Sequence, residues 1–161
     1  MISASDLKEF AFFKGFSDQE LEKLAAVAKE ETYDAGTQMY KNGDPARGLF
    51  LIREGKMILV MDGYLGPHKP SMQVTVDVVT KGESMGWSAV VEPYIYTLGA
   101  LCFDRAKVIA LDAPGLRKLM DEDTCLGYRI MKATAQVIAN RLTHTRIILV
   151  GERGLSTLTE Y

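Results

Sequence analysis

Residues 36–112 are built from short apolar runs that are separated by turns rich in Gly, Asp and Pro. Most of these runs have the length of a strand, about four to eight residues, and Val, Ile and Leu dominate them. The expected strands lie in TQMYK, LFLIREG, KMILVMDG, MQVTVDVVTKGES, TLGALCFD and AKVIALD. Strands at this spacing predict a mainly β fold with some α, a double-stranded β-helix barrel of the jelly-roll type. GYLGPHKPS is expected to form an exposed hairpin tip, because proline cannot donate to a ladder.

Residues 1–35, which precede the barrel, are expected to form a helical segment. Ser17 stands directly before DQELEKLAAVAKEE, and Glu20 follows it by three residues, which is the spacing of a capping box. The run FAFFKGF carries more aromatic residues than a solvated turn needs. Its rings are therefore expected to dock on the rest of the fold, in particular those of Phe12, Phe13 and Phe16.

Residues 113–150 return to helix, with a short helix in APGLRKLMDED and a long one from Thr124 to about Val150. One row of the long helix turns polar halfway along: Leu126, Ile130, Ala133, Val137, Asn140, His144. A second row stays mostly apolar to its end: Met131, Ala135, Ile138, Leu142, Thr145, Leu149. A repeat of about 3.5 residues over this length favours a helix–helix seam. The first row is therefore expected to face the barrel.

The second row predicts a dimer interface made of Met131, Ala135, Ile138, Leu142 and Leu149. The alternative is a long helix that packs only on its own domain. Gly151 and Gly154 are expected to end the helix, which leaves residues 151–161 as a tail.

The length, net charge and cysteine content of the chain limit the classes of function that it can have. The 161 residues fit one domain. A net charge of −2, from 19 basic and 21 acidic residues, argues against nucleic acid as the main partner. Cys102 and Cys125 are too far apart in sequence to suggest a disulfide framework and indicate a reducing compartment. Since no secretion signal and no membrane-length apolar run is visible, we expect a cytoplasmic protein without a membrane partner.

The inventory of reactive residues argues against catalysis. The chain has two histidines, His68 and His144, and it lacks the motifs of a nucleophile elbow or a phosphate-binding P-loop. A cupin-like metal enzyme would need several histidines and a carboxylate around one ion. We therefore expect no enzyme and no metal site. About eleven residues follow Val150, which are fewer than a three-helix DNA-binding domain requires, so no direct DNA binding is expected.

The glycine turns of the barrel carry the most specific signal. YDAG precedes the first strands, NGDPARGLFLIREGKM contributes Gly43, Gly48 and Gly55, and KGESMGW follows later. In tight turns only glycine adopts a positive φ at low cost. In this order, the turns resemble those of the cyclic-nucleotide-binding domain family over about residues 12–149. In catabolite-activator-type and oxygen-sensing regulators of that family the long helix forms a dimer seam, which agrees with the apolar row.

The resemblance also implies a phosphate-binding cassette. In members that bind cyclic nucleotide, a Glu of the cassette holds the ribose hydroxyl and an Arg pairs with the cyclic phosphate. Aligned on Gly86, the Glu position holds Trp87 and the Arg position holds Tyr96, followed by Thr97. Glu83 stands four residues before the expected place. Because a buried phosphate without a cation is costly, these replacements argue against cyclic nucleotide as the ligand.

The candidate ligand pocket consists of the cassette residues Gly82, Glu83, Met85, Gly86, Trp87, Ser88, Ala89, Tyr96 and Thr97. Trp87 and Tyr96 either plug it or line it for an aromatic or apolar ligand. The sequence names no cofactor, and haem on His144 is not expected, because nothing nearby in sequence supplies a second ligand.

Together these observations predict a stand-alone regulatory or sensor domain with a degenerate cassette. It would sense a small molecule other than cyclic nucleotide, or act as a homodimeric adaptor for an unidentified protein partner. A true cyclic nucleotide receptor and a ligand-free scaffold are the alternatives.

Overall fold

The barrel consists of two antiparallel sheets, as the spacing of the apolar runs predicts. The computed structural model describes residues 1–63, 67 and 72–158, with side chains up to residue 154. The strands in this part of the chain are β1 (Ala28–Tyr33), β2 (Gln38–Tyr40), β3 (Gly48–Glu54), β4 (Met57–Gly63), β5 (Met72–Val79), β6 (Ser84–Met85), β7 (Gly99–Cys102) and β8 (Ala106–Asp112). One four-stranded sheet has the order β1-β8-β3-β6 and the other β2-β7-β4-β5. Most of the expected hairpin tip, GYLGPHKPS, lies outside the described residues.

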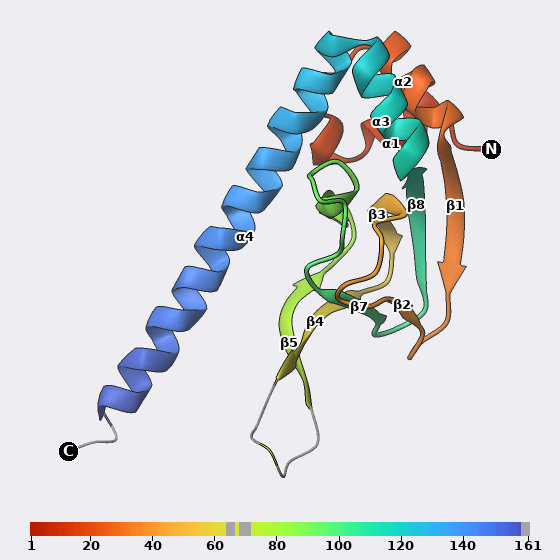
Figure 1. Ribbon diagram of the computed structural model, residues 1–161. Coiled ribbons are helices and arrows are strands. Elements are labelled where there is room, and N and C mark those ends of the chain that lie inside the picture. The colour runs from red at the N-terminus through yellow and green to blue at the C-terminus, as the bar shows by residue number, and fades with distance from the viewer. Residues whose placement is uncertain (64–66, 68–71, 159–161) are drawn as a thin grey trace.

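Helices enclose one end of the barrel and one long helix leaves it. The helical elements are α1 (Ala4–Lys8), η1 (Ala11–Phe13), α2 (Asp18–Ala26), η2 (Trp87–Ala89), α3 (Ala113–Glu122) and α4 (Thr124–Leu158). Figure 1 shows α1, α2 and α3 gathered at one end of the sheets, from which α4 runs past the barrel on the side of β5. The order of helix, barrel, helix and long helix that the sequence predicts is confirmed.

The N-terminal aromatic run packs as its composition predicts. Phe12 and Phe13 are 8% and 3% exposed, and Phe16 packs against the same core. Ser17 caps α2: the Glu20 amide donates to Ser17 Oγ at 3.2 Å, and the Ser17 amide donates to the Glu20 carboxylate at 2.7 Å. This segment therefore closes the end of the core.

Two expected boundaries were wrong. Residues 1–35 are not wholly helical, because β1 occupies Ala28–Tyr33. Its sequence, AKEETY, is polar because it is an edge strand, and its ladder with β8, from Ala28 opposite Leu111 to Tyr33 opposite Ala106, supplies the pairing that its composition does not suggest.

The long helix does not end at residue 150 but continues to Leu158. Neither Gly151 nor Gly154 adopts the left-handed conformation of a helix cap, and a Cβ at either position would meet nothing within 4 Å. A glycine inside a helix costs only about 1 kcal/mol relative to alanine, so without a proline it does not stop the helix. The expected tail therefore belongs to α4 for most of its length.

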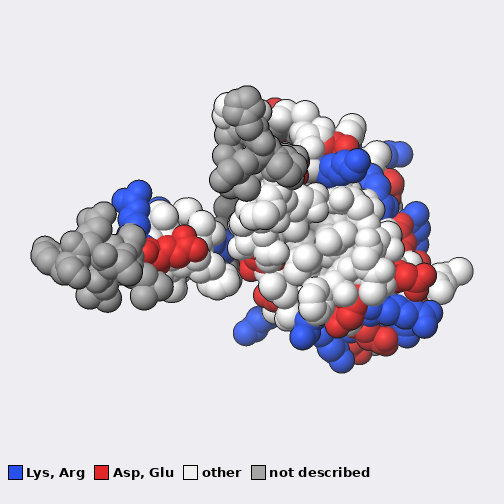
Figure 2. Space-filling model, turned by 90° about the horizontal axis from the view of Figure 1, so that it is seen from below, with Lys and Arg blue, Asp and Glu red and all other residues white. Residues whose placement is uncertain are grey.

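The surface is uncharged over one broad face. Figure 2, which views the molecule from below, shows uncharged side chains across this face and charges of both signs around its edge. The face therefore lacks the continuous cationic field that a nucleic-acid-binding surface requires. Within the described residues, no helix has the length and apolarity to span a membrane.

Candidate functional site

The cassette starts from a backbone contact that only glycine permits. β6 pairs with β3, with Met85 opposite Phe50. The next residue, Gly86, has φ 80°, and a Cβ at this position would lie 2.8 Å from the carbonyl oxygen of Gly48. A larger residue at position 86 would push the start of η2 away from β3. Gly86 thereby fixes the start of η2, which begins at Trp87.

Tyr96 fills the centre of the cassette. Its side chain is 2% exposed, and its ring stacks on that of Tyr40 with 3.7 Å between centroids. Its hydroxyl accepts from the backbone amides of Arg47 and Gly48, both at 3.1 Å, and donates to the Gly48 carbonyl at 3.0 Å. The cavity left in the cassette has a volume of about 20 Å³. This is room for about one water molecule.

Burial keeps both tyrosines neutral. Burial raises the pKa of Tyr96, although its hydrogen bonds with the backbone of Gly48 and Arg47 act in the opposite direction. Burial raises the pKa of Tyr40 as well, and the neighbouring Tyr96 adds to the effect. The stacked rings therefore bring no charge into the cassette at neutral pH.

The structure brings most of the predicted pocket residues together. Those that line the cassette cavity are Met85, Gly86, Trp87, Ser88, Tyr96 and Thr97. Gly82 and Glu83 line a neighbouring cavity instead. Glu83 lies in the turn after β5 and accepts hydrogen bonds from the Thr80 amide at 2.7 Å and the Thr80 hydroxyl at 3.0 Å. Ala89 is buried, and its carbonyl accepts from Arg117 of α3 at 2.8 Å.

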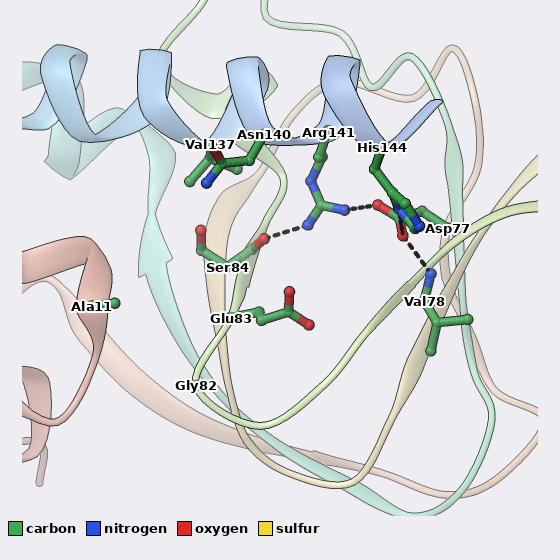
Figure 3. A pocket seen from close by; sticks show the side chains of 10 residues that line it. All are labelled: Ala11, Asp77, Val78, Gly82, Glu83, Ser84, Val137, Asn140, Arg141 and His144. Atoms are coloured by element: carbon green, nitrogen blue, oxygen red, sulfur yellow. Dashed lines mark hydrogen bonds and ion pairs between the residues drawn. The ribbon is translucent and has the colours of Figure 1, made fainter. Parts of the chain in front are cut away.

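Arg141 of α4 also reaches the cassette, and the sequence patterns did not single it out. Its side chain is 19% exposed and lines both the cassette cavity and the neighbouring one. Its Nη2 donates to the Ser84 carbonyl at 2.7 Å, and its Nη1 pairs with Asp77 of β5 (Figure 3). Arg141 follows Val137 by four residues and so lies on the same side of the helix. A cation beside the barrel-facing row was therefore the signal that could have found it.

The neighbouring cavity, called the side cavity below, lies between α4 and the turn from β5 to β6. It has a volume of about 370 Å³ (Figure 3). His144 lies beside it with Nδ1 3.5 Å from Asp77 Oδ1, and the His144 side chain is 58% exposed. The Nε of Arg141 is buried, and no described atom accepts its hydrogen bond. Among the described residues, no group of three or more His, Cys, Asp and Glu could hold a metal ion.

Replacing Arg141 with glutamine should destabilise the protein by about 1–3 kcal/mol, because Asp77 then loses its charged partner in a mostly buried position. Urea unfolding would measure the loss. Arg146→Gln, at an exposed position on the same helix, is the matched control and should change the free energy of unfolding by less than about 0.5 kcal/mol. Equal effects of the two substitutions would contradict the role given to Arg141.

The two rows of α4 differ in exposure as expected. Leu126 and Ile130 are fully buried, whereas Met131 and Leu142 are 40% and 48% exposed. Leu149 is 48% exposed as well. The apolar row is therefore exposed at these three positions, whereas Ile138 is half-buried. The dimer interface that the row predicts stays a prediction.

Comparisons with known proteins agree with this architecture. A family model described as cyclic nucleotide-binding domain matches residues 30–123. A crystal structure from Geobacter metallireducens GS-15, named for cyclic nucleotide binding, shares 27% identity and a TM-score of 0.77, covering 88% of this chain and 99% of its own. A cyclic nucleotide-binding domain from Methylobacillus flagellatus KT has the same fold, with 18% identity, a TM-score of 0.76 and coverage of 92% and 85%.

A curated relative places a similar sequence within a longer protein. Glutaminase 1 of Bradyrhizobium diazoefficiens is 29% identical over 141 residues, which are 86% of this chain and 21% of the glutaminase. The chain thus spans about a fifth of the length of this relative.

Proposed function

Because this chain belongs to the cyclic nucleotide-binding domain family, we propose that it is a regulatory domain whose nucleotide space has become part of the packed core. The family is one of regulatory binding domains and not of enzymes. In this proposal the domain acts as a dimeric adaptor through α4, and it does not require a bound cyclic nucleotide. Glutaminase activity is not carried over, because the similarity covers only a fifth of that enzyme.

The observation that supports this function best is the buried position of the Tyr96 ring in the cassette. Its ring occupies the cassette and leaves about 20 Å³, whereas ligand pockets usually measure about 300–1,000 Å³. A nucleotide could enter only if the ring left Tyr40 and the hydroxyl gave up its bonds to Gly48 and Arg47. The ring of Tyr96 therefore competes directly with a nucleotide for this space.

Arg141 does not restore the missing cation. It is the one charged side chain among the described residues that line the cassette cavity, and it already binds Asp77 and the Ser84 carbonyl. A cyclic phosphate that recruited Arg141 would leave the Asp77 carboxylate without its charged partner in a mostly buried site, which is costly. The charge balance therefore opposes phosphate binding as well.

We expect cyclic AMP and cyclic GMP at millimolar concentration to leave the melting temperature unchanged. Binding at 100 times Kd would stabilise the folded state by about 2.7 kcal/mol, which a thermal melt resolves easily. A cyclic-AMP-binding regulatory subunit treated identically serves as the positive control. Saturable heat of binding in calorimetry, lost when Thr97 is changed to Val, would contradict the proposal.

The side cavity favours a second candidate function, the sensing of a small anion other than cyclic nucleotide. At about 370 Å³ it has the volume of a ligand site. The buried Nε of Arg141 is a hydrogen-bond donor without an acceptor among the described residues, so it could donate to a ligand. Such a ligand would compete with Asp77 for the guanidinium and so act on the contact between α4 and β5. The Arg141→Gln variant separates the two functions, because stabilisation by a small carboxylate or phosphate ester would be lost in that variant.

A further inference from the structure

A groove of about 770 Å³ separates the N-terminal segment from α4. Four apolar side chains contribute to its base: Phe12, Phe16, Ala133 and Val137. All four also pack against the core, so the base is preformed. The groove follows α4 from Cys125 to Asn140, a distance of about 22 Å at 1.5 Å per residue.

The rims of the groove are cationic. Lys14 lies on the N-terminal rim and Lys132 on the α4 rim. Both side chains are exposed, and neither makes a hydrogen bond or ion pair with any described residue. Arg129 is already engaged, with Nε 3.1 Å from Glu20 and with Nη1 donating to the Gly15 carbonyl, and it joins the two rims. On a chain of net charge −2, this groove is therefore a local positive site with two lysines available.

The groove lies on a different flank of α4 from the apolar row. Successive residues of an α-helix are about 100° apart around the axis, so the directions of Gln136 in the groove and Ile138 in the row differ by about 160°. The barrel-facing residues Ile130 and Val137 lie between the two flanks. Pairing of two α4 helices through the apolar row would therefore leave the groove open.

We propose that the groove docks an acidic amphipathic segment of a partner protein. The apolar base accepts apolar side chains, as in other sites that bind a helix in a groove. Lys14 and Lys132 stand on opposite rims, so an occupant that satisfies both must carry at least two carboxylates, which a simple fatty acid does not. The length of about 22 Å matches about four turns of helix. This docking does not depend on whether the cassette binds a ligand.

Peptide display tests the proposal with the full chain as bait. Random peptides of about 15 residues, the length that spans the groove, are selected on the unmodified protein and counter-selected on the Lys14→Glu/Lys132→Glu variant. We expect selected peptides to carry Asp or Glu beside apolar residues at helical spacing. Fluorescence anisotropy with the synthetic peptides should show affinity weakened about 30-fold in the variant. Replacing the peptide carboxylates by amides should weaken binding similarly.

A control variant carries the same change of charge elsewhere. Lys56→Glu/Lys118→Glu alters two exposed lysines outside the groove and should keep the affinity within about twofold. Circular dichroism establishes that both variants fold. Three results would overturn the proposal: no selected peptide, selected peptides without acidic residues, or equal binding by the groove variant and the unmodified protein. If the Lys14→Glu/Lys132→Glu substitutions change the sedimentation of the protein alone, a second copy of the chain, and not a partner protein, binds the groove.

Discussion

Tyr96→Ala is expected to lower the free energy of unfolding by about 3–5 kcal/mol, the usual cost of removing a large buried ring. Tyr96 is 2% exposed and stacks on Tyr40, which in turn stacks on Phe50 with 6.0 Å between centroids. Removing the ring leaves a cavity in the middle of this stack. Guanidinium unfolding followed by Trp87 fluorescence would measure the loss, since Trp87 is the single tryptophan and lines the same cavity.

Tyr96→Phe separates the ring from the hydroxyl. It keeps the stack and removes only the group that bonds the Arg47 and Gly48 amides and the Gly48 carbonyl. The expected cost is about 1–3 kcal/mol, because these backbone groups lose a partner. If Tyr96→Ala costs less than 1 kcal/mol, the ring is not part of the core, and the cassette is a pocket that Tyr96 can vacate.

Ile138→Asp combined with Leu142→Asp is expected to convert a dimer into a folded monomer. The apolar row of α4 would leave an exposed apolar patch on a single chain, which soluble proteins rarely carry. Truncating one buried Leu or Ile typically costs about 2–5 kcal/mol, and a symmetric dimer loses each contact twice. The dimer Kd should therefore rise by more than about 1,000-fold. Sedimentation velocity at about 50 µM, well above a micromolar Kd, would show the change.

A matched variant controls for the added charge on the helix. Gln136→Asp with Thr143→Asp places the same two carboxylates on the other flank of α4, with Gln136 in the groove and Thr143 beyond its end at Asn140. This variant should remain dimeric, and both should keep the β-sheet signal in circular dichroism. Sedimentation of the unmodified protein as a monomer at this concentration would mean that α4 packs only on its own domain.

The fold could be predicted from the sequence largely because its turns depend on local backbone geometry. The close approach of Gly86 to Gly48 is an example, because only glycine tolerates it and the sequence shows the glycine. β1 was missed because an edge strand takes its pairing from β8 and not from its own composition. The extent of α4 was missed because glycine weakens a helix without ending it.

The site was only half predictable. From the sequence, the family resemblance predicts that Trp87 and Tyr96 stand at the positions of the cassette's charged pair. The link from Arg141 to Ser84 joins residues far apart in the chain, and it depends on how α4 is rotated against the barrel. The spacing of residues within a single helix or strand does not determine that rotation. The partners of Arg141 could therefore be recognised only once α4 and the β5–β6 turn were placed together.

The buried ring of Tyr96, unlike a bound ligand, is part of every molecule of the protein. Stabilisation by a diffusible ligand grows with its concentration, as the logarithm of one plus the ratio of ligand to Kd. A ring that belongs to the chain is present at a fixed effective concentration in every molecule, because its contacts with Tyr40 and Gly48 are intramolecular. Under the proposed function, a domain closed in this way would have an output that follows the number of copies made. Synthesis and turnover of the protein, and not the level of a metabolite, would then control it.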